Sequence, residues 1–232
     1  MRSSFLKKSG FTLVELLTVI AIIGVLAAFT MPVLRSVGRT TKIARAGAEM
    51  VAIESALDNY KAQYGFYPPG SGNGAAAAVV NQLYYELTGV TNVTLNSIPC
   101  YQTLDGGSIV GTGFFANLFH VGGVMNCCKN AGEEVTQAKS FLYLKPNQIG
   151  SLPITNSFGG YAVNFLVTSV GGPDAAYQPM GFPGLNPFRY LAPGPANNNA
   201  NGYDLWIQLV IGGKTNLVSN WSQKVIINSP LP

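Results

Sequence analysis

One carboxylate, Glu15, lies inside a long apolar run near the start of the chain. The run extends from Phe11 to Leu34, and Glu15 is its single ionisable side chain. A charge in an apolar setting is costly, so such a residue normally has a functional partner. If the chain were cut between Gly10 and Phe11, the new amino group on Phe11 would lie one helical turn from Glu15. In a bundle of identical helices, Glu15 of one copy could then pair with the Phe11 ammonium of the next, and this pairing would favour assembly in register.

Three cysteines are the other reactive side chains. Cys100, Cys127 and Cys128 lack the spacing of zinc ligands, and the single histidine, His120, cannot complete a Cys/His site. A disulfide from Cys100 to either member of the vicinal pair can form outside the cytoplasm, and three buried thiols are the alternative. We expect no metal site and no cofactor from these residues.

Motifs for catalysis are missing from the sequence. It has no Gly-x-Ser-x-Gly elbow, no phosphate loop and no cluster of paired carboxylates; Glu133-Glu134 is typical of solvated surface. Charged residues make up 10% of the chain, and three of the charges behind its net +4 precede Gly10. A nearly neutral remainder gives no electrostatic basis for binding nucleic acid. We therefore expect neither an enzyme nor a nucleic-acid-binding protein.

The apolar run is long enough to cross a membrane as a helix, which takes about 20 residues. The alternative is a secretory signal peptide with Arg2, Lys7 and Lys8 as its basic region, cut near Ala27-Ala28. The apolar part of a signal peptide is usually about 7–15 residues, which is shorter than this run. A helical pattern also continues well beyond the run, and both features favour a membrane-spanning helix.

The continuation is amphipathic. Apolar residues recur every three or four positions, at Ile43, Ala46, Met50, Ile53, Leu57, Tyr60 and Tyr64. We expect this stripe to pack on the protein's own sheet. Pro32 should kink or loosen the helix, and Gly65 with Pro68-Pro69 should end it.

The segment SGFTLVELLTVIAIIGVLAAFTMP (Ser9–Pro32) resembles the N-terminal signature of type IV pilins and type II secretion system pseudopilins. The resemblance implies that a prepilin peptidase cuts after Gly10 and N-methylates Phe11. It implies that Glu15 guides subunit addition to a homo-oligomeric filament. Further implied partners are minor pseudopilins, an inner-membrane assembly platform and the lipid bilayer. The implied location is the inner membrane, crossed once, with the leader in the cytoplasm and the head in the periplasm, followed by a periplasmic or cell-surface filament.

Several later segments resemble the major pseudopilin of type II secretion. They are ALDNYKAQYGFYPPG (Ala56–Gly70), NPFRYLAPG (Asn186–Gly194), YDLW (Tyr203–Trp206) and the final Asn220-Trp221 pair. The implied function is that of a structural subunit for protein transport, without enzyme activity. The alternative is a subunit of a true type IV pilus for adhesion, motility or DNA uptake.

The implied fold is α+β and pilin-like, with a long N-terminal helix packed on a small antiparallel sheet. We expect a leader at 1–10, a hydrophobic helix at 11–34, its amphipathic continuation at 35–66 and a globular head at 67–232. Strand signals cover residues 161–170, 187–192, 203–211 and 224–228. Further helices are expected within 75–89 and 132–144. A loop-rich insertion, about 90–158, is read as an elaborated surface loop, with a partner-specific contact surface as the alternative.

One departure from the major pseudopilin concerns calcium. In that family the loop before the final Asn-Trp pair holds calcium, which needs several carboxylates. Here Ile207–Asn220 contains no Asp or Glu, and Asp204 alone cannot form the site. We therefore expect no calcium, and a loop held by packing, backbone carbonyls and Asn side chains.

Overall fold

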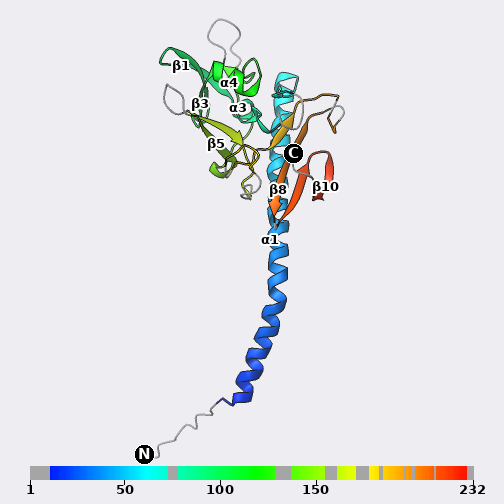
Figure 1. Ribbon diagram of the computed structural model, residues 1–232. Coiled ribbons are helices and arrows are strands. Elements are labelled where there is room, and N and C mark those ends of the chain that lie inside the picture. Colours follow the sequence, from blue (N-terminus) through cyan, green and yellow to red (C-terminus); the bar gives the residue numbers. More distant parts are fainter. Residues whose placement is uncertain are drawn as a thin grey trace, which may run out of the picture. The chain divides into compact units, whose positions relative to one another are not determined.

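The computed structural model describes residues 11–72, 78–128, 137–154, 161–170, 178–182, 185–195, 197–199, 202–211 and 213–228. The chain divides into two compact units, residues 1–41 and 42–232. Figure 1 shows the long helix α1 followed by short helices and strands, an α+β composition. The second half of α1 therefore belongs to the same unit as the head.

Helix α1 runs from Leu13 to Tyr64 and its backbone remains helical through Pro32. It ends where the sequence predicts. Gly65 follows with φ 84°, a conformation that suits glycine, and its N–H donates to the Lys61 carbonyl at 2.7 Å. Among the described residues, we find no helix that combines the length and apolar character needed to cross a membrane. The span expected over 11–34 is thus not confirmed here.

In the second unit, α1 uses the predicted stripe. Its buried members are Ala46, Met50, Ile53, Leu57 and Tyr60, while Ile43 and Tyr64 pack partly buried against the same core. Fully burying one such side chain stabilises a fold by roughly 1.5–3 kcal/mol. The stripe therefore fixes the head to the helix, as expected.

The C-terminal sheet is antiparallel and has the strand order β10-β9-β8-β7. Its strands are β7 (Arg189–Leu191), β8 (Asp204–Ile211), β9 (Lys214–Ser219) and β10 (Ser222–Ile227). Strands were expected at three of these places. The segment Ile207–Asn220, expected to be a loop, is instead most of a β-hairpin, in which Ile211 pairs with Lys214. Strand β10 is one end of this strand order, and its register shifts between Ser222 and Ile226.

The insertion is more regular than a surface loop. It contains a second sheet with the order β3-β2-β1-β4, in which β1 and β4 run parallel. The strands are β1 (Val90–Leu95), β2 (Ile98–Thr103), β3 (Ile109–Gly111) and β4 (Cys127–Cys128). Helix α4 (Thr112–Phe119) follows β3, a 3-10 turn η1 spans Pro146–Gln148, and β5 (Ile149–Ile154) pairs with β6 (Tyr161–Leu166). The segment expected to be an elaborated surface loop therefore contains regular strands and a helix that the sequence did not predict.

Two helix predictions need correction. Within 75–89, the continuous helix is α3 (Leu83–Thr88), and residues 73–77 lie outside the described part of the chain. Of the helix expected at 132–144, residues 137–144 are not helical and the rest lies outside the described residues. The backbone there bonds elsewhere: Lys139 N–H donates to the Asn126 amide oxygen, and Phe141 N–H donates to the Leu87 carbonyl.

Candidate functional site

The start of α1 is closed by a reciprocal cap between Thr12 and Glu15. The Thr12 N–H and hydroxyl donate to Glu15 Oε2 at 2.9 and 2.7 Å, and Glu15 N–H donates to Thr12 Oγ1 at 3.3 Å. This is a capping box, in which the first and fourth residues satisfy each other's free backbone groups. Sequence reasoning assigned Glu15 a partner in another copy and missed this partner in its own chain.

The cap leaves part of the carboxylate free. All three bonds involve Oε2 or the Glu15 backbone, so no hydrogen bond from the described residues occupies Oε1, which can accept from another molecule. Phe11 is 76% exposed, and Gly10 lies outside the described residues. The structure therefore describes one side of the predicted cleavage position.

Large exposed apolar side chains lie near Glu15, at Phe11 and along the first part of α1. They are Phe11, Leu13, Val14, Leu16, Leu17, Val19, Ile20, Ile22, Ile23, Val25 and Leu26. An apolar surface of this extent, interrupted by Glu15 and Thr18, needs an apolar environment to cover it.

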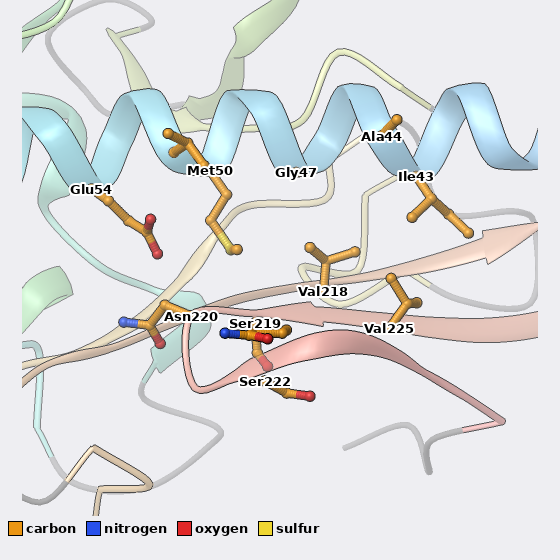
Figure 2. A pocket seen from close by; sticks show the side chains of 12 residues that line it. Ile43, Ala44, Gly47, Met50, Glu54, Val218, Ser219, Asn220, Ser222 and Val225 are labelled. Carbon is orange, nitrogen blue, oxygen red and sulfur yellow. The ribbon is translucent and has the colours of Figure 1, made fainter.

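A groove on the head lies between α1 and the β9–β10 hairpin (Figure 2), with a volume of about 460 Å³. Its apolar walls come from the helix and the strands, and the small Gly47 leaves the helix backbone open to it. One end is polar. There the Ser219 hydroxyl is buried without a hydrogen-bond partner, and burial, followed by repulsion from Asp58, raises the pKa of Glu54. Figure 2 shows the Glu54 carboxylate pointing from the helix toward Asn220.

The three cysteines are free thiols. Strand β1 explains why Cys100 does not join either neighbour of the vicinal pair. Cys100 on β2 is opposite Val93, whereas Cys127 on β4 is opposite Val90, on the other side of β1. Two strand spacings make about 9.6 Å, and a disulfide needs Cα atoms closer than about 7 Å. The thiol alternative is the one that this geometry supports.

Asp204 holds the loop before β8 through hydrogen bonds. Its carboxylate accepts hydrogen bonds from Asn198 N, Asn198 Nδ2 and Asn199 N at 2.7, 2.9 and 3.0 Å. The residues that the structure describes contain no group of three or more His, Cys, Asp and Glu side chains suited to a metal. His120 is exposed at the C-cap of α4, with φ 53°.

The Asn220-Trp221 pair closes the β9–β10 turn onto β8. The Asn220 amide oxygen accepts from Leu205 N–H, and its Nδ2 donates to the Tyr203 carbonyl, each at 3.0 Å. Trp221 packs edge-on against Trp206, with ring centroids 5.5 Å apart. Asn side chains thus do the bridging expected of them in this region.

Sequence reasoning also missed a buried carboxylate, Glu86 on α3. It has no exposed surface, and donors from three separate segments converge on it. The only signal in the sequence is an acid within the otherwise apolar and aromatic LYYELT segment, and nothing there identifies its partners.

Comparison with known proteins bears on the N-terminal region. Residues 6–31 match the family model described as the prokaryotic N-terminal methylation motif. The type II secretion system core protein G of Vibrio cholerae is 40% identical over 62 residues, and that of Escherichia coli is 44% identical over 62 residues. These matches cover 27% of this chain and 42% and 43% of the two relatives, so the chain spans less than half of their length.

The fimbrial protein EcpC of Eikenella corrodens is 31% identical over 91 residues, which is 39% of this chain and 60% of that protein. No solved structure matches this chain. The comparisons confirm the resemblance inferred from Ser9–Pro32 for the N-terminal region. The motif covers Gly10, Phe11 and Glu15.

Proposed function

We propose that this chain is a pseudopilin, a structural subunit of a type II secretion-like filament assembled from the inner membrane to drive protein export. The match of residues 6–31 to the methylation motif supports this proposal most, because the matched range includes Gly10, Phe11 and Glu15, the residues proposed here for cleavage, methylation and assembly. The similarity to core protein G relatives supports the secretion system over other users of the motif.

The steps follow from residues at the start of α1. A prepilin peptidase cuts after Gly10 and methylates the new amino group of Phe11. Glu15 Oε1, which its own capping box does not use, then accepts a hydrogen bond from the Phe11 ammonium group of a neighbouring copy. The pair neutralises two charges where water is scarce, and a copy without a neighbour lacks this gain.

The exposed apolar surface of residues 11–28 has a role before and after assembly. In the membrane it contacts lipid, with the leader in the cytoplasm and the head in the periplasm. In the filament it contacts the same surface of other copies. The groove beside Gly47 on the head is a second surface that a neighbouring subunit can cover. Minor pseudopilins and an inner-membrane platform complete the set of proposed partners.

A true type IV pilus is the second candidate, because the fimbrial protein EcpC matches a longer part of this chain than core protein G does. The assembly chemistry is the same in both. The two are separated by deleting the gene and measuring protein secretion alongside surface piliation. Loss of secretion with unchanged piliation supports the pseudopilin, and the reverse supports the pilus.

The first test is intact mass measurement and N-terminal peptide mapping of the protein from its native membrane. We expect a mature chain that begins at N-methylated Phe11, and Gly10→Ala should retain the whole leader. Ser9→Ala is the matched control and should be processed normally. A mature chain that starts near Phe29 would identify an ordinary signal peptide and would remove Glu15 from its proposed role.

A further inference from the structure

Four donors surround the buried carboxylate of Glu86. Oε1 accepts from Gln82 Nε2 at 3.1 Å and from Met125 N–H at 3.0 Å. Oε2 accepts from Asn126 N–H at 3.1 Å and from the Tyr60 hydroxyl at 2.9 Å. One side chain therefore ties the segment around Met125 to α3 and to the long helix α1.

The segment around Met125 is also held by hydrogen bonds between groups that do not change protonation state with pH. The Asn126 Nδ2 group donates to the carbonyls of Glu86 and Lys139, and its amide oxygen accepts from the Tyr64 hydroxyl at 2.8 Å. Asn126 O also accepts from Val90 N–H, where β4 begins to pair with β1. The Asn126 bonds therefore keep the segment in place even without Glu86. A change at Glu86 should loosen the segment rather than release it.

The groups facing Glu86 are neutral acids. They are Tyr60 and Tyr64 of α1, Tyr101 of β2, Cys127 of β4 and Tyr190 of β7; burial raises the pKa of each, and the Glu86 charge adds to that rise. Strand β7 also carries the buried Arg189. No basic side chain of the described residues forms an ion pair with Glu86. Within the described part of the chain, hydrogen bonds are therefore the contacts that stabilise an ionised Glu86.

We propose that Glu86 is a proton-controlled latch, which holds residues 121–128 against α1 and α3 when it is neutral and loosens them when it ionises. A buried carboxylate without a counter-ion gains free energy if the segment opens and water reaches it. The neutral acid has no such gain. It still accepts from Met125 N–H and can share its proton with the Tyr60 hydroxyl, which is both donor and acceptor.

The direction of the pH effect agrees with this account. Burial raises the pKa of Glu86 from 4.5 to about 7, against the opposing effect of its four hydrogen bonds. In the opened segment the group would titrate near its ordinary value. Opening is therefore rarest in acid and becomes more frequent as pH rises, until Glu86 in the closed form has ionised near neutrality. Met125, already 52% exposed, lies at the surface that would change.

Hydrogen exchange of the full-length protein in detergent tests the proposal. After correction for intrinsic exchange rates, protection of peptides covering 121–128 should fall at least about tenfold between about pH 5 and about pH 8.5. Peptides from β8 and β9 are the internal reference and should not change. Protection of 121–128 that does not depend on pH would overturn the proposal.

Three variants sharpen the test. Glu86→Gln resembles the neutral acid and should abolish the pH dependence; an unchanged pH dependence in this variant would also overturn the proposal. Tyr60→Phe removes one bond to the carboxylate, so the midpoint should move to higher pH. Tyr64→Phe is the matched control, because it removes a bond to Asn126 and should lower protection equally at every pH. If Glu86→Gln does not fold, a Tyr60→Phe midpoint that stays in place or moves to lower pH contradicts the latch.

Discussion

At the residue scale, the Glu15 carboxylate has one observed role, in the cap of α1, and one proposed role, between copies. Its Oε2 completes the cap of α1, and its Oε1 is free for another copy. A capping side chain stabilises a helix by about 1 kcal/mol, and this gain is present in every copy. An ion pair between copies arises only on assembly. The two roles can therefore be separated by changing the other member of the cap.

Thr12→Val removes the two cap bonds of the Thr12 hydroxyl but keeps the Glu15 carboxylate and its bond from Thr12 N–H, whereas Glu15→Ala removes the carboxylate and both bonds to it. We expect both variants to be processed to Phe11. Thr12→Val should form filaments at close to the normal level, because the cost is only about 1 kcal/mol at the helix start. Glu15→Ala should assemble poorly. Filament yield by electron microscopy is the measurement, and equal yields from the two variants would contradict a role for Glu15 between copies.

Asp204 provides a second test at this scale. Its carboxylate accepts three hydrogen bonds from Asn198 and Asn199, so Asp204→Ala leaves those donors without an acceptor. We expect a loss of about 2 kcal/mol of head stability, measured by thermal unfolding. Asp58→Ala, which removes an exposed acceptor of the Tyr67 hydroxyl, is the control and should change little.

Chelation of calcium should leave the melting temperature of the wild-type head unchanged, since amide donors already occupy the Asp204 carboxylate. A fall in melting temperature on adding a chelator, reversed by calcium, would contradict this interpretation of the loop.

At the scale of elements, helices and strands could be predicted from the sequence where a periodic apolar pattern packs against a single core. The stripe from Ala46 to Tyr60 and the β-branched run of β8 both face a continuous core, so period and composition were enough. The strands of the insertion were not predicted, because β1 and β2 are short and partly exposed and carry polar residues on both faces. The helix predicted over residues 137–144 was wrong for another reason. Backbone N–H groups there donate to Asn126 and Leu87, and no local sequence pattern reveals these distant partners.

The residues of the candidate site also differ in whether the sequence could identify them. Glu15 could be identified from sequence because its meaning depends on the apolar residues beside it. Glu86 could not, because two of its donors lie 39 and 40 residues further along the chain.

Strand order makes a prediction about the thiols. Because β1 separates β2 from β4, the protein isolated without reductant should carry three alkylatable cysteines per chain after denaturation. Mass measurement after alkylation provides the count. One remaining thiol would show that two cysteines are joined, and peptide mapping that places Cys100 in the bridge would show that the strand order around β1 differs in the oxidised protein.

At the scale of the whole molecule, the head is held to the amphipathic half of α1 by apolar contacts and by buried polar groups. One such group is the Glu49 carboxylate, which accepts from Thr168 Oγ1 and Ser169 N at 2.9 and 3.0 Å. Another is Glu86, which joins the insertion to the same helix. The insertion is therefore built into the head and not merely attached to its surface.

This construction predicts a pH dependence of global stability. The pKa of Glu86 is about 7 in the folded head, above its ordinary 4.5, so the unfolded chain loses this proton first as pH rises. The contribution is complete below about pH 4.5 and is lost as pH rises through about 7. Wild-type protein should lose more stability than Glu86→Gln between about pH 5 and about pH 8, measured by chemical denaturation. Equal losses in the two proteins would show that other groups govern the dependence.

The open edge of the C-terminal sheet has a consequence for crowded surroundings. Among the described strands, β10 has β9 as its single neighbour; it carries the exposed Lys224, and its register shifts between Ser222 and Ile226. An irregular, charged edge is a poor template for a strand from another molecule. Heads gathered side by side in a filament would meet at very high local concentration, where a flat edge would recruit neighbours into continuous sheets. The irregularity of β10 would keep such crowding reversible, so that each copy could leave the filament as the same folded molecule that entered it.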